Sequence, residues 1–323
     1  MTLRQPLAGQ GVLVTGGAGF IGSHLVDRLL RDGAREVVVI DNMFLGSQEN
    51  LVDALATGRT TFYRDDAEFA SSLDFIFQDH RIDTVFNCAT KALNYSFQNP
   101  SNAFSTNVTV ALNLLELQRR GAFRTLCHFS TSEVYGTAVY EPMDEAHPRN
   151  PTTTYAAGKA AADLAVESYV HMFGVDAFIV RPFNNYGPRQ NHQGPLAGII
   201  PVTAKRILTG GQPEQHGDGL QSRDFIYVTD TVDAVVKLYA NLPAGDSVNI
   251  STDNQISVAD LLKRISAALR YQGETLHKAA RPADVQCHNA SNAKVKTLID
   301  YSLTPFEVGL AQTLRHYQHM FGG

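Results

Sequence analysis

Short apolar runs alternate with longer amphipathic stretches through the first half of the chain. Runs such as VLVTG, VVVID and TVFNCA are apolar at consecutive positions, which is typical of parallel strands covered by helices on both faces. We expect strands near Gly11–Thr15, Val37–Asp41, Thr60–Asp65, Thr84–Ala89, Thr125–Ser130 and Ala177–Pro182, and helices near Phe20–Asp32, Ala67–Asp79, Asn102–Arg119 and Thr154–Phe173. The pattern predicts an α/β fold built on a doubly wound parallel sheet.

The alternation loosens after about Arg181, where Gly and Pro interrupt the stretch NNYGPRQNHQGPLAG. Later helices are expected near Pro195–Thr209, Ser257–Tyr271 and Pro305–Met320. We therefore expect one domain over residues 1–180 and a smaller C-terminal region over residues 181–323. The run at 247–250 could return to the main sheet as a further strand.

The helix expected at Asn102–Arg119 carries apolar residues on more than one face, with Val108, Leu112 and Leu115 along one line. One face must meet the sheet, and the other could meet an intrachain helix or a partner subunit. We expect a homodimer.

Composition and charge exclude several classes of protein. The chain has 323 residues, 44% hydrophobic and 18% charged, which allows a large core. A net charge of -5 without blocks of like charge argues against a nucleic-acid partner. The segment MTLRQPLAGQGVLVTGG lacks the features of a secretory signal, and the chain has no run long and apolar enough to span a membrane. We expect a cytoplasmic protein with no membrane contact.

The cysteines Cys88, Cys127 and Cys287 are far apart and show no CxxC or Cys/His ligand spacing. This spacing argues against both a disulfide framework and a metal site. We interpret them as reduced thiols that pack as small apolar side chains.

The strongest local signal is VLVTGGAGFIGSHLVDRLLRDG, which places Gly16, Gly19 and Gly22 between a predicted strand and an amphipathic helix. Gly16 permits a tight turn, Gly19 lets the backbone approach a pyrophosphate, and Gly22 brings the helix against the strand. We expect Phe20 and Ile21 to lie at the same dinucleotide site. The alternative is a glycine-rich turn that only caps a helix.

Asp41 lies nineteen residues after Gly22, at the end of the next predicted strand. An acidic side chain there accepts hydrogen bonds from the adenosine ribose and repels the extra phosphate of NADP, so the predicted cofactor is NAD. The following residues, NMFLGS, supply no Arg or Lys for that phosphate. We also expect Asn42 among the cofactor-binding residues.

A second signal is the pair Tyr155 and Lys159 in the segment YAAGK. A spacing of four places both side chains on one helical face, where an ammonium would lower the pKa of the phenol from about 10. We expect Tyr155 to act as a base and Lys159 as its electrostatic partner. Such a pair also occurs by chance on surface helices.

A third signal is the segment STSEVYG, residues 130–136, at the end of the fifth predicted strand. Functional groups collect at the carboxyl ends of strands in doubly wound sheets, and Thr131 could hydrogen-bond a substrate oxygen there. The alternative is a strand-ending turn capped by Ser and Thr.

Together TGGAGFIG, STSEVYG, YAAGK and RPFNNYGPR resemble the extended short-chain dehydrogenase/reductase family over nearly the whole chain. The resemblance is to its nucleotide-sugar enzymes, especially the UDP-glucose and UDP-glucuronate 4-epimerases. It implies a Rossmann-like fold, NAD as the cofactor and a UDP-sugar as the substrate. The segments GDGLQSRDFIYVTD and RPADV resemble those that grip the nucleotide diphosphate in such enzymes.

The resemblance implies a role for each matching residue. Thr131, Tyr155 and Lys159 would be the catalytic triad. Asp65 would contact the adenine. Asn184 and Arg223 would contact the diphosphate or its ribose, and Arg281 would be a further ligand of the diphosphate. The guanidinium forks suit phosphate oxygens, although a single arginine is more often part of a surface ion pair.

Two residues depart from the ordinary pattern. Gly158 stands where related enzymes often carry a small hydroxyl residue, and glycine inside a helix costs about 1 kcal/mol relative to alanine. A close approach to the cofactor or to backbone would explain it. Lys91, after NCAT, could meet an acidic group of the substrate, or it could be a solvated loop lysine.

The implied first step is shared by three reactions: Tyr155 takes the proton of a sugar hydroxyl, most simply O4, as hydride passes from C4 to NAD. The ketone could then be reduced on its other face, lose water across C5 and C6, or lose carbon dioxide from a C6 carboxylate. The usual motif of hexose dehydratases has Asp-Glu directly after the catalytic threonine. At the matching positions after Thr131, this chain has Ser132 and Glu133. Glu133 would assist chemistry next to C5 in a dehydratase or decarboxylase, and would orient the ring in an epimerase.

We favour 4-epimerisation of a UDP-hexose or UDP-hexuronic acid, with UDP-glucuronate preferred because TSE recurs among glucuronate-processing relatives. Lys91, Arg189 and His192 are candidate cations for its carboxylate, and Ser132 a further substrate contact. A 4,6-dehydratase and a UDP-glucuronate decarboxylase are the alternatives. A catalytically silent NAD-binding sensor on the same fold is a third, and the retained Thr131, Tyr155 and Lys159 argue against it.

Overall fold

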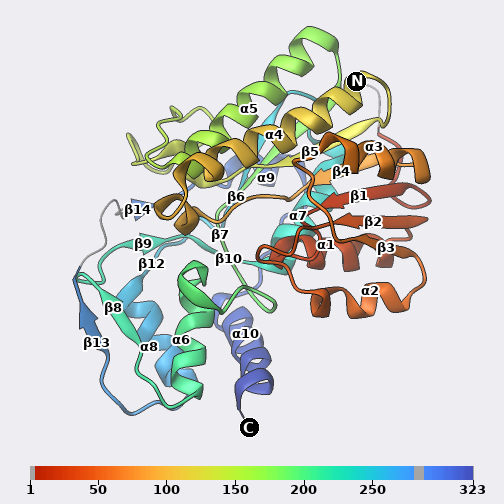
Figure 1. Cartoon of the computed structure of the whole chain (residues 1–323). Helices are drawn as coiled ribbons and strands as arrows, with labels where there is room; N and C mark the ends of the chain where they lie inside the picture. The colour runs from red at the N-terminus through yellow and green to blue at the C-terminus, as the bar shows by residue number, and fades with distance from the viewer. Residues whose placement is uncertain (1–3, 280–286, 323) are drawn as a thin grey trace.

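Seven parallel strands form the central sheet of the computed structural model, which describes residues 4–279 and 287–322 (Figure 1). The strands are β1 (Gly11–Thr15), β2 (Glu36–Ile40), β3 (Thr60–Tyr63), β4 (Thr84–Asn87), β5 (Thr125–Phe129), β6 (Asp176–Pro182) and β11 (Ser247–Ile250). Their order across the sheet is β3-β2-β1-β4-β5-β6-β11, and every neighbouring pair is parallel. The direction in which the chain adds strands reverses between β1 and β4, so the predicted doubly wound α/β fold is confirmed.

Helices cover both faces of the sheet. One layer contains α1 (Phe20–Arg31), α2 (Val52–Ala56), α7 (Val228–Asn241) and α9 (Ala293–Leu298), and the other contains α3 (Ala70–Asp79), α4 (Pro100–Arg119) and α5 (Thr154–Phe173). Successive residues of β1 face opposite layers, since Val12 and Val14 pack with α1 while Leu13 packs with α4. The uninterrupted apolar runs of the sequence follow from this two-sided burial.

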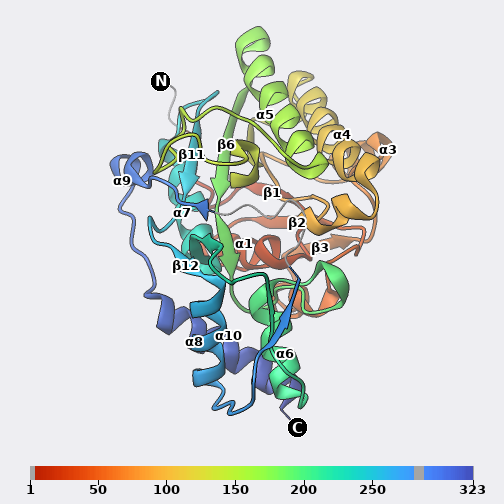
Figure 2. The ribbon, with the colours of Figure 1, turned by 90° about the vertical axis from the view of Figure 1, so that its left-hand side faces the viewer.

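A smaller lobe lies beyond the carboxyl ends of the strands, below the sheet in Figures 1 and 2. Its helices α6 (Ile199–Leu208), α8 (Val258–Ala268) and α10 (Phe306–Phe321) share a core that includes Ile200, Leu261 and Leu314. The short strands beside them are β7 (Asn184–Tyr186), β8 (Glu214–His216), β9 (Ser222–Arg223), β10 (Phe225–Tyr227), β12 (Ile256–Ser257), β13 (Leu276–Lys278) and β14 (Cys287–His288).

The elements expected from the pattern are present with ends shifted by a few residues, but α2, α7 and α9 were not predicted. The segment VTDTVDAVVKLYAN of α7 is rich in β-branched residues, which favour strands. Its apolar residues nevertheless recur at helical spacing, and Val232, Val235 and Leu238 are buried in the same core as α1. Tertiary packing thus outweighs local propensity there.

The run at 247–250 is β11, which pairs with β6 at the edge of the main sheet. The chain therefore returns to the sheet after building part of the smaller lobe. None of the helices within residues 4–279 and 287–322 is long and apolar enough to cross a bilayer.

Helices α4 and α5 lie side by side, and their closest approach explains Gly158 (Figure 2). A Cβ atom at residue 158 would lie 2.6 Å from the Phe104 carbonyl oxygen and 3.0 Å from its Cα atom. The neighbouring atoms are backbone, so they cannot move aside as a flexible side chain would. Only glycine allows the two helices to pack at this distance, so α5 covers one side of α4 while Phe104 and Leu112 stay exposed.

We expect Gly158→Ala to destabilise the protein by about 1–3 kcal/mol, as overpacking does, although alanine favours a helix by about 1 kcal/mol over glycine. Urea unfolding followed by circular dichroism measures the difference. Ala157→Ser on the same helix is the control, and its effect should stay within about 0.5 kcal/mol. A Gly158→Ala protein as stable as the parent would show that the helices separate freely.

Candidate active site

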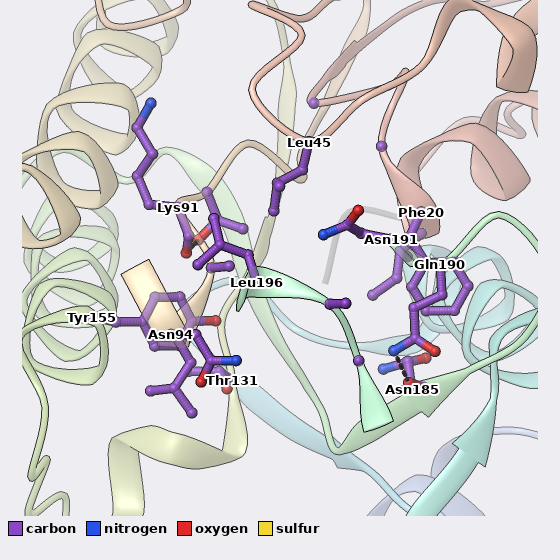
Figure 3. Close-up of a pocket in the computed structure, with 18 of the residues that line it drawn as sticks. Phe20, Leu45, Lys91, Asn94, Thr131, Tyr155, Asn185, Gln190, Asn191 and Leu196 are labelled. Carbon is purple, nitrogen blue, oxygen red and sulfur yellow. Dashed lines mark hydrogen bonds between the residues drawn. The ribbon is translucent and has the colours of Figure 1, made fainter. Parts of the chain in front are cut away.

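A cavity of about 690 Å³ lies at the carboxyl ends of the strands, between the sheet and the smaller lobe (Figure 3). Its sheet side is lined by residues that directly follow β1, β2, β3, β4 and β5, and its other side by residues from β7, β9 and the smaller lobe. The cavity thus lies at the point where the strand order reverses, which is the usual ligand site of a doubly wound sheet.

The glycine loop after β1 has the backbone geometry that the sequence predicts. Gly16 has a φ of +67°, and a Cβ atom there would lie 2.8 Å from the Ala89 amide nitrogen. Gly22 packs so closely on the loop that a Cβ atom would overlap the Gly16 carbonyl. Gly19 is the last residue before α1, whose amino end faces the cavity. The space that absent side chains leave at this helix end fits the pyrophosphate of a dinucleotide.

Asp41 follows β2 and braces this loop. Its carboxylate accepts hydrogen bonds from the amides of Ala18 at 3.0 Å and Met43 at 2.8 Å, while burial raises its pKa above the ordinary value. Asn42 donates to the Asp66 carboxylate at 2.7 Å. The cavity lining includes every residue that the sequence assigns to the cofactor: Gly16, Gly19, Phe20, Ile21, Gly22, Asp41, Asn42, Asp65, Tyr155 and Lys159. These lining residues and the space above the glycine loop after β1 fit NAD.

Thr131 and Tyr155 meet at one end of the cavity (Figure 3). Thr131 follows β5 and caps a short 3-10 helix, η3 (Ser132–Tyr135), by accepting a hydrogen bond from the Glu133 amide at 3.2 Å. Tyr155 lies in the first turn of α5, where its amide donates to the Ser96 hydroxyl at 3.0 Å. Two separate helix starts therefore place the two hydroxyl groups next to each other.

Burial dominates the electrostatics of the triad. It raises the pKa of Tyr155 to about 12, a shift that hydrogen bonding with Thr131 opposes and the charge of Glu133 increases. Burial likewise lowers the pKa of Lys159 to about 8, against the opposing charge of Asp163. The Lys159 ammonium donates to the Phe129 carbonyl oxygen at 2.8 Å. The predicted lowering of the Tyr155 pKa by Lys159 is therefore wrong for the protein by itself, because desolvation of the phenolate outweighs it.

Asn184 and Arg223 line the wall of the cavity that the smaller lobe supplies. Asn184 begins β7 and donates to the Asp224 carbonyl at 3.4 Å, and Arg223 ends β9 and donates to the Ser222 carbonyl at 2.9 Å. Their positions opposite the glycine loop are compatible with the predicted nucleotide contacts. The third candidate, Arg281, lies outside the residues that the structure describes.

The three cations expected to meet a substrate carboxylate point elsewhere. Lys91 lines the cavity, but its ammonium lies 4.3 Å from the centre of the Phe44 ring and 3.9 Å from the Glu68 carboxylate, directed away from Tyr155 (Figure 3). Arg189 pairs with Asp27 on α1 at 2.7 Å, and the His192 ring packs against Tyr317 and Phe321. Neither Arg189 nor His192 is among the described lining residues.

Ser132 and Glu133 are buried in η3 and are also not among the described residues that line the cavity. Their predicted contacts with the sugar are therefore not seen in this structure. Glu133 lies behind Thr131, close enough for its charge to act on Tyr155.

The sequence analysis missed amide side chains that line the cavity from two loops. Asn94, in the 3-10 helix η2 (Leu93–Phe97), donates to the Pro195 carbonyl at 3.3 Å and so links this helix to η4 (Gly194–Leu196) across the cavity. Gln190 donates to the Asn185 carbonyl at 3.2 Å (Figure 3). The signal for Gln190 was the density of amides, Gly and Pro in NNYGPRQN, a segment that does not include Asn94.

Within residues 4–279 and 287–322, no three His, Cys, Asp or Glu side chains lie close enough together to hold a metal ion. Cys88 and Cys127 are free thiols, and burial raises the pKa of each above its ordinary range. Both are thus inert core or near-core groups at neutral pH.

Comparison with known proteins gives a consistent result. Residues 12–251 match the NAD dependent epimerase/dehydratase family. The chain is 31% identical over 310 residues to the UDP-glucose 4-epimerase of Mycolicibacterium smegmatis, covering 95% of this chain and 98% of that protein. It is also 31% identical over 315 residues to UDP-glucuronic acid decarboxylase 1 of Xenopus tropicalis, covering 95% and 72%.

Among solved structures, the UDP-glucose 4-epimerase of Thermotoga maritima with UDP-glucose superposes with a TM-score of 0.91 at 30% identity, covering 96% of this chain and 99% of that one. The match covers nearly the whole chain, so it includes the sheet, the glycine loop and the smaller lobe. The chain belongs to the NAD-dependent epimerase/dehydratase family, the nucleotide-sugar enzymes among the extended short-chain dehydrogenases/reductases.

Proposed function

We propose that the protein is a 4-epimerase of a UDP-hexose. The observation that carries this choice is the placement of Glu133. Dehydration across C5 and C6 needs an acid and a base that reach the sugar, and the acid nearest to Thr131 in the sequence is held in η3, behind the cavity wall. Epimerisation needs only the triad and room for the ring to turn.

In this reaction the hydroxyl groups of Thr131 and Tyr155 hold the sugar O4, and Tyr155 takes its proton. NAD, which the glycine loop and Asp41 would hold, would supply the hydride acceptor and donor that the side chains lack. Lys159 keeps a positive charge near the phenolate, and Tyr155 returns the proton once the ring has turned. The high pKa of free Tyr155 suits it to hold the proton between turnovers.

A neutral hexose fits the cavity better than the hexuronic acid that the sequence favoured. The preference for UDP-glucuronate depended on the TSE motif and on three candidate cations for its carboxylate, Lys91, Arg189 and His192, and each of these three side chains has another partner. The cavity lining includes uncharged amides that suit sugar hydroxyls, with Asn94 on the side of Tyr155 and Thr131 and with Gln190 and Asn191 across from them (Figure 3). We therefore propose a UDP-hexose with an uncharged C6 substituent.

Proton NMR of the protein with NAD and UDP-glucose in deuterated water tests this function. We expect a UDP-galactose signal to appear with no deuterium at any ring carbon, because the hydride returns to the carbon it left. Deuterium at C5 would instead identify a dehydratase. A UDP-pentose formed from UDP-glucuronate would identify a decarboxylase, and either result would overturn the proposal.

Tyr155→Phe should retain NAD but lower kcat at least about 100-fold, since a positioned acid–base group contributes about 10²–10⁴. Turnover of UDP-glucose measures kcat, and the absorbance of bound dinucleotide measures cofactor content. Tyr140→Phe, which removes an exposed hydroxyl bonded to Asp144, is a control that should change kcat less than about threefold. An unaffected Tyr155→Phe enzyme would mean that another group is the base.

We further propose that the protein is a homodimer formed through α4 and α5. Phe104 and Leu112 on α4 and Leu164 on α5 are large apolar side chains that remain exposed. Burying this surface against a second copy would remove it from water. Leu164→Asp should shift the mass measured by analytical ultracentrifugation from dimer to monomer, whereas Leu220→Asp, exposed in the smaller lobe, should leave it unchanged. A monomeric parent protein would contradict the proposal.

A further inference from the structure

A fully buried ion pair lies beneath the catalytic end of α5. Asp163 is one helical turn after Lys159 and has no exposed surface. The Arg181 guanidinium of β6 donates through Nε and Nη2 to the Asp163 Oδ2 atom, both at 3.0 Å. Its remaining nitrogen, Nη1, donates to the Tyr135 hydroxyl at 3.1 Å and to the Ser247 hydroxyl at 2.9 Å. The ion pair is therefore held from two strands, β6 and β11, and from the helices α5 and η3, away from solvent.

A chain of buried polar groups reaches Asp163 from the other side. The Thr15 hydroxyl, at the end of β1, donates to Asn87 Oδ1 at 2.7 Å, and Asn87 Nδ2 lies 3.1 Å from His128 Nδ1. An amide nitrogen can only donate, so His128 Nδ1 accepts and its proton is on Nε2. That N–H lies 3.8 Å from Asp163 Oδ1.

The chain of contacts therefore crosses β1, β4 and β5 before it reaches α5. It starts at the residue that precedes Gly16 of the cofactor loop and ends at the carboxylate beside Lys159. Burial lowers the pKa of His128 well below its ordinary range, so the ring is neutral and adds no charge of its own. Burial also raises the pKa of Asp163, but the Arg181 guanidinium opposes that shift, so Asp163 is the anion of this group.

Among the described residues, Asp163 supplies the carboxylate charge that acts on Lys159. The β5 strand contributes the Phe129 carbonyl and neutral His128, the residue after β4 contributes the Cys88 thiol, and α5 contributes Tyr155 and Asp163. Arg181, on β6, is the other cation, and its charge is engaged by Asp163. Glu133 acts on Tyr155 instead.

We propose that Asp163 is a positioning residue for the reaction: fixed by Arg181 and faced by His128, its carboxylate keeps Lys159 in the ammonium form. Residues four apart on a helix face the same side, and a charge acts more strongly in a buried site than in water. Arg181 keeps Asp163 ionised, because a buried carboxylate without a cation beside it would take up a proton. The activity measurement rests on the proposed epimerase function, whereas the titration below does not.

Asp163→Asn removes the charge with little change of shape. The Lys159 pKa, already lowered to about 8 by burial, should fall further, so that the ammonium is lost at a lower pH. We expect the ratio of parent to variant kcat to grow about tenfold between about pH 6 and pH 9, which corresponds to a fall of about one pKa unit, with KM for UDP-glucose changed less than about twofold. A ratio that stays constant with pH would mean that Asp163 only supports the fold, and would overturn the proposal.

NMR titration of protein labelled with ¹³C at lysine Cε measures the same pKa without turnover. The Lys159 signal is assigned by its loss in Lys159→Arg, and its midpoint in Asp163→Asn should lie about one pH unit below that of the parent. Equal midpoints would overturn the inference even if the enzyme is active. A shifted midpoint in a protein that does not act on UDP-sugars would support Asp163 and reject the proposed function.

Asp176→Asn is the matched control, because it removes another Arg–Asp ion pair, with Arg4 at 2.6 Å, from the far end of β6. It should change stability without moving the pH profile or the Lys159 midpoint. Should Asp163→Asn fail to fold with Arg181 unpaired, Asp163→Asn/Arg181→Met removes both charges together, and the Lys159 midpoint should still fall, by less than in the single variant because the Arg181 cation is lost as well. An unmoved midpoint in that double variant would equally overturn the proposal.

Discussion

The reversal of strand order between β1 and β4 is the constraint on which the rest of the structure depends. Because connections from these two strands leave toward opposite faces of the sheet, their carboxyl ends are not covered by a crossing helix. The glycine loop, Asp41 and Thr131 all follow strands at this edge, and the smaller lobe closes the opening from below. The strand order therefore creates the cavity, and the side chains that line it determine what it can bind.

Burial sets the chemistry of that cavity more than any single pair of charges. The same desolvation that raises the pKa of Tyr155 lowers the pKa of Lys159, so both groups are driven toward their neutral forms. Reaction at a sugar hydroxyl needs at least one of them charged. The fold meets this need through compensating groups within hydrogen-bonding or Coulomb reach: Thr131 beside the phenol, and Phe129 and Asp163 beside the ammonium.

Much of this arrangement could be predicted from the sequence, and the failures have physical causes. The sequence predicts strands that are buried on both faces, because their residues are apolar at consecutive positions. It also predicts glycines that the backbone requires, such as Gly16 and Gly22. The partners of long polar side chains cannot be predicted in this way. Lys91 and Arg189 can each reach several groups, and tertiary packing decides which one they contact. Helix α7 was missed for a related reason: its β-branched residues are helical only because α1 and the sheet cover them.

The contact between Gly158 and the Phe104 backbone has a consequence for how the molecule responds to strain. Elsewhere in the core, side chains separate neighbouring helices and can adjust their rotamers when one helix moves, but here no side chain lies between them. A displacement of α4 is therefore transmitted directly to the turn that carries Tyr155 and Lys159. Since α4 also presents the exposed side chains of Phe104 and Leu112, a partner bound to its outer surface would press through this contact on the helix that carries Tyr155.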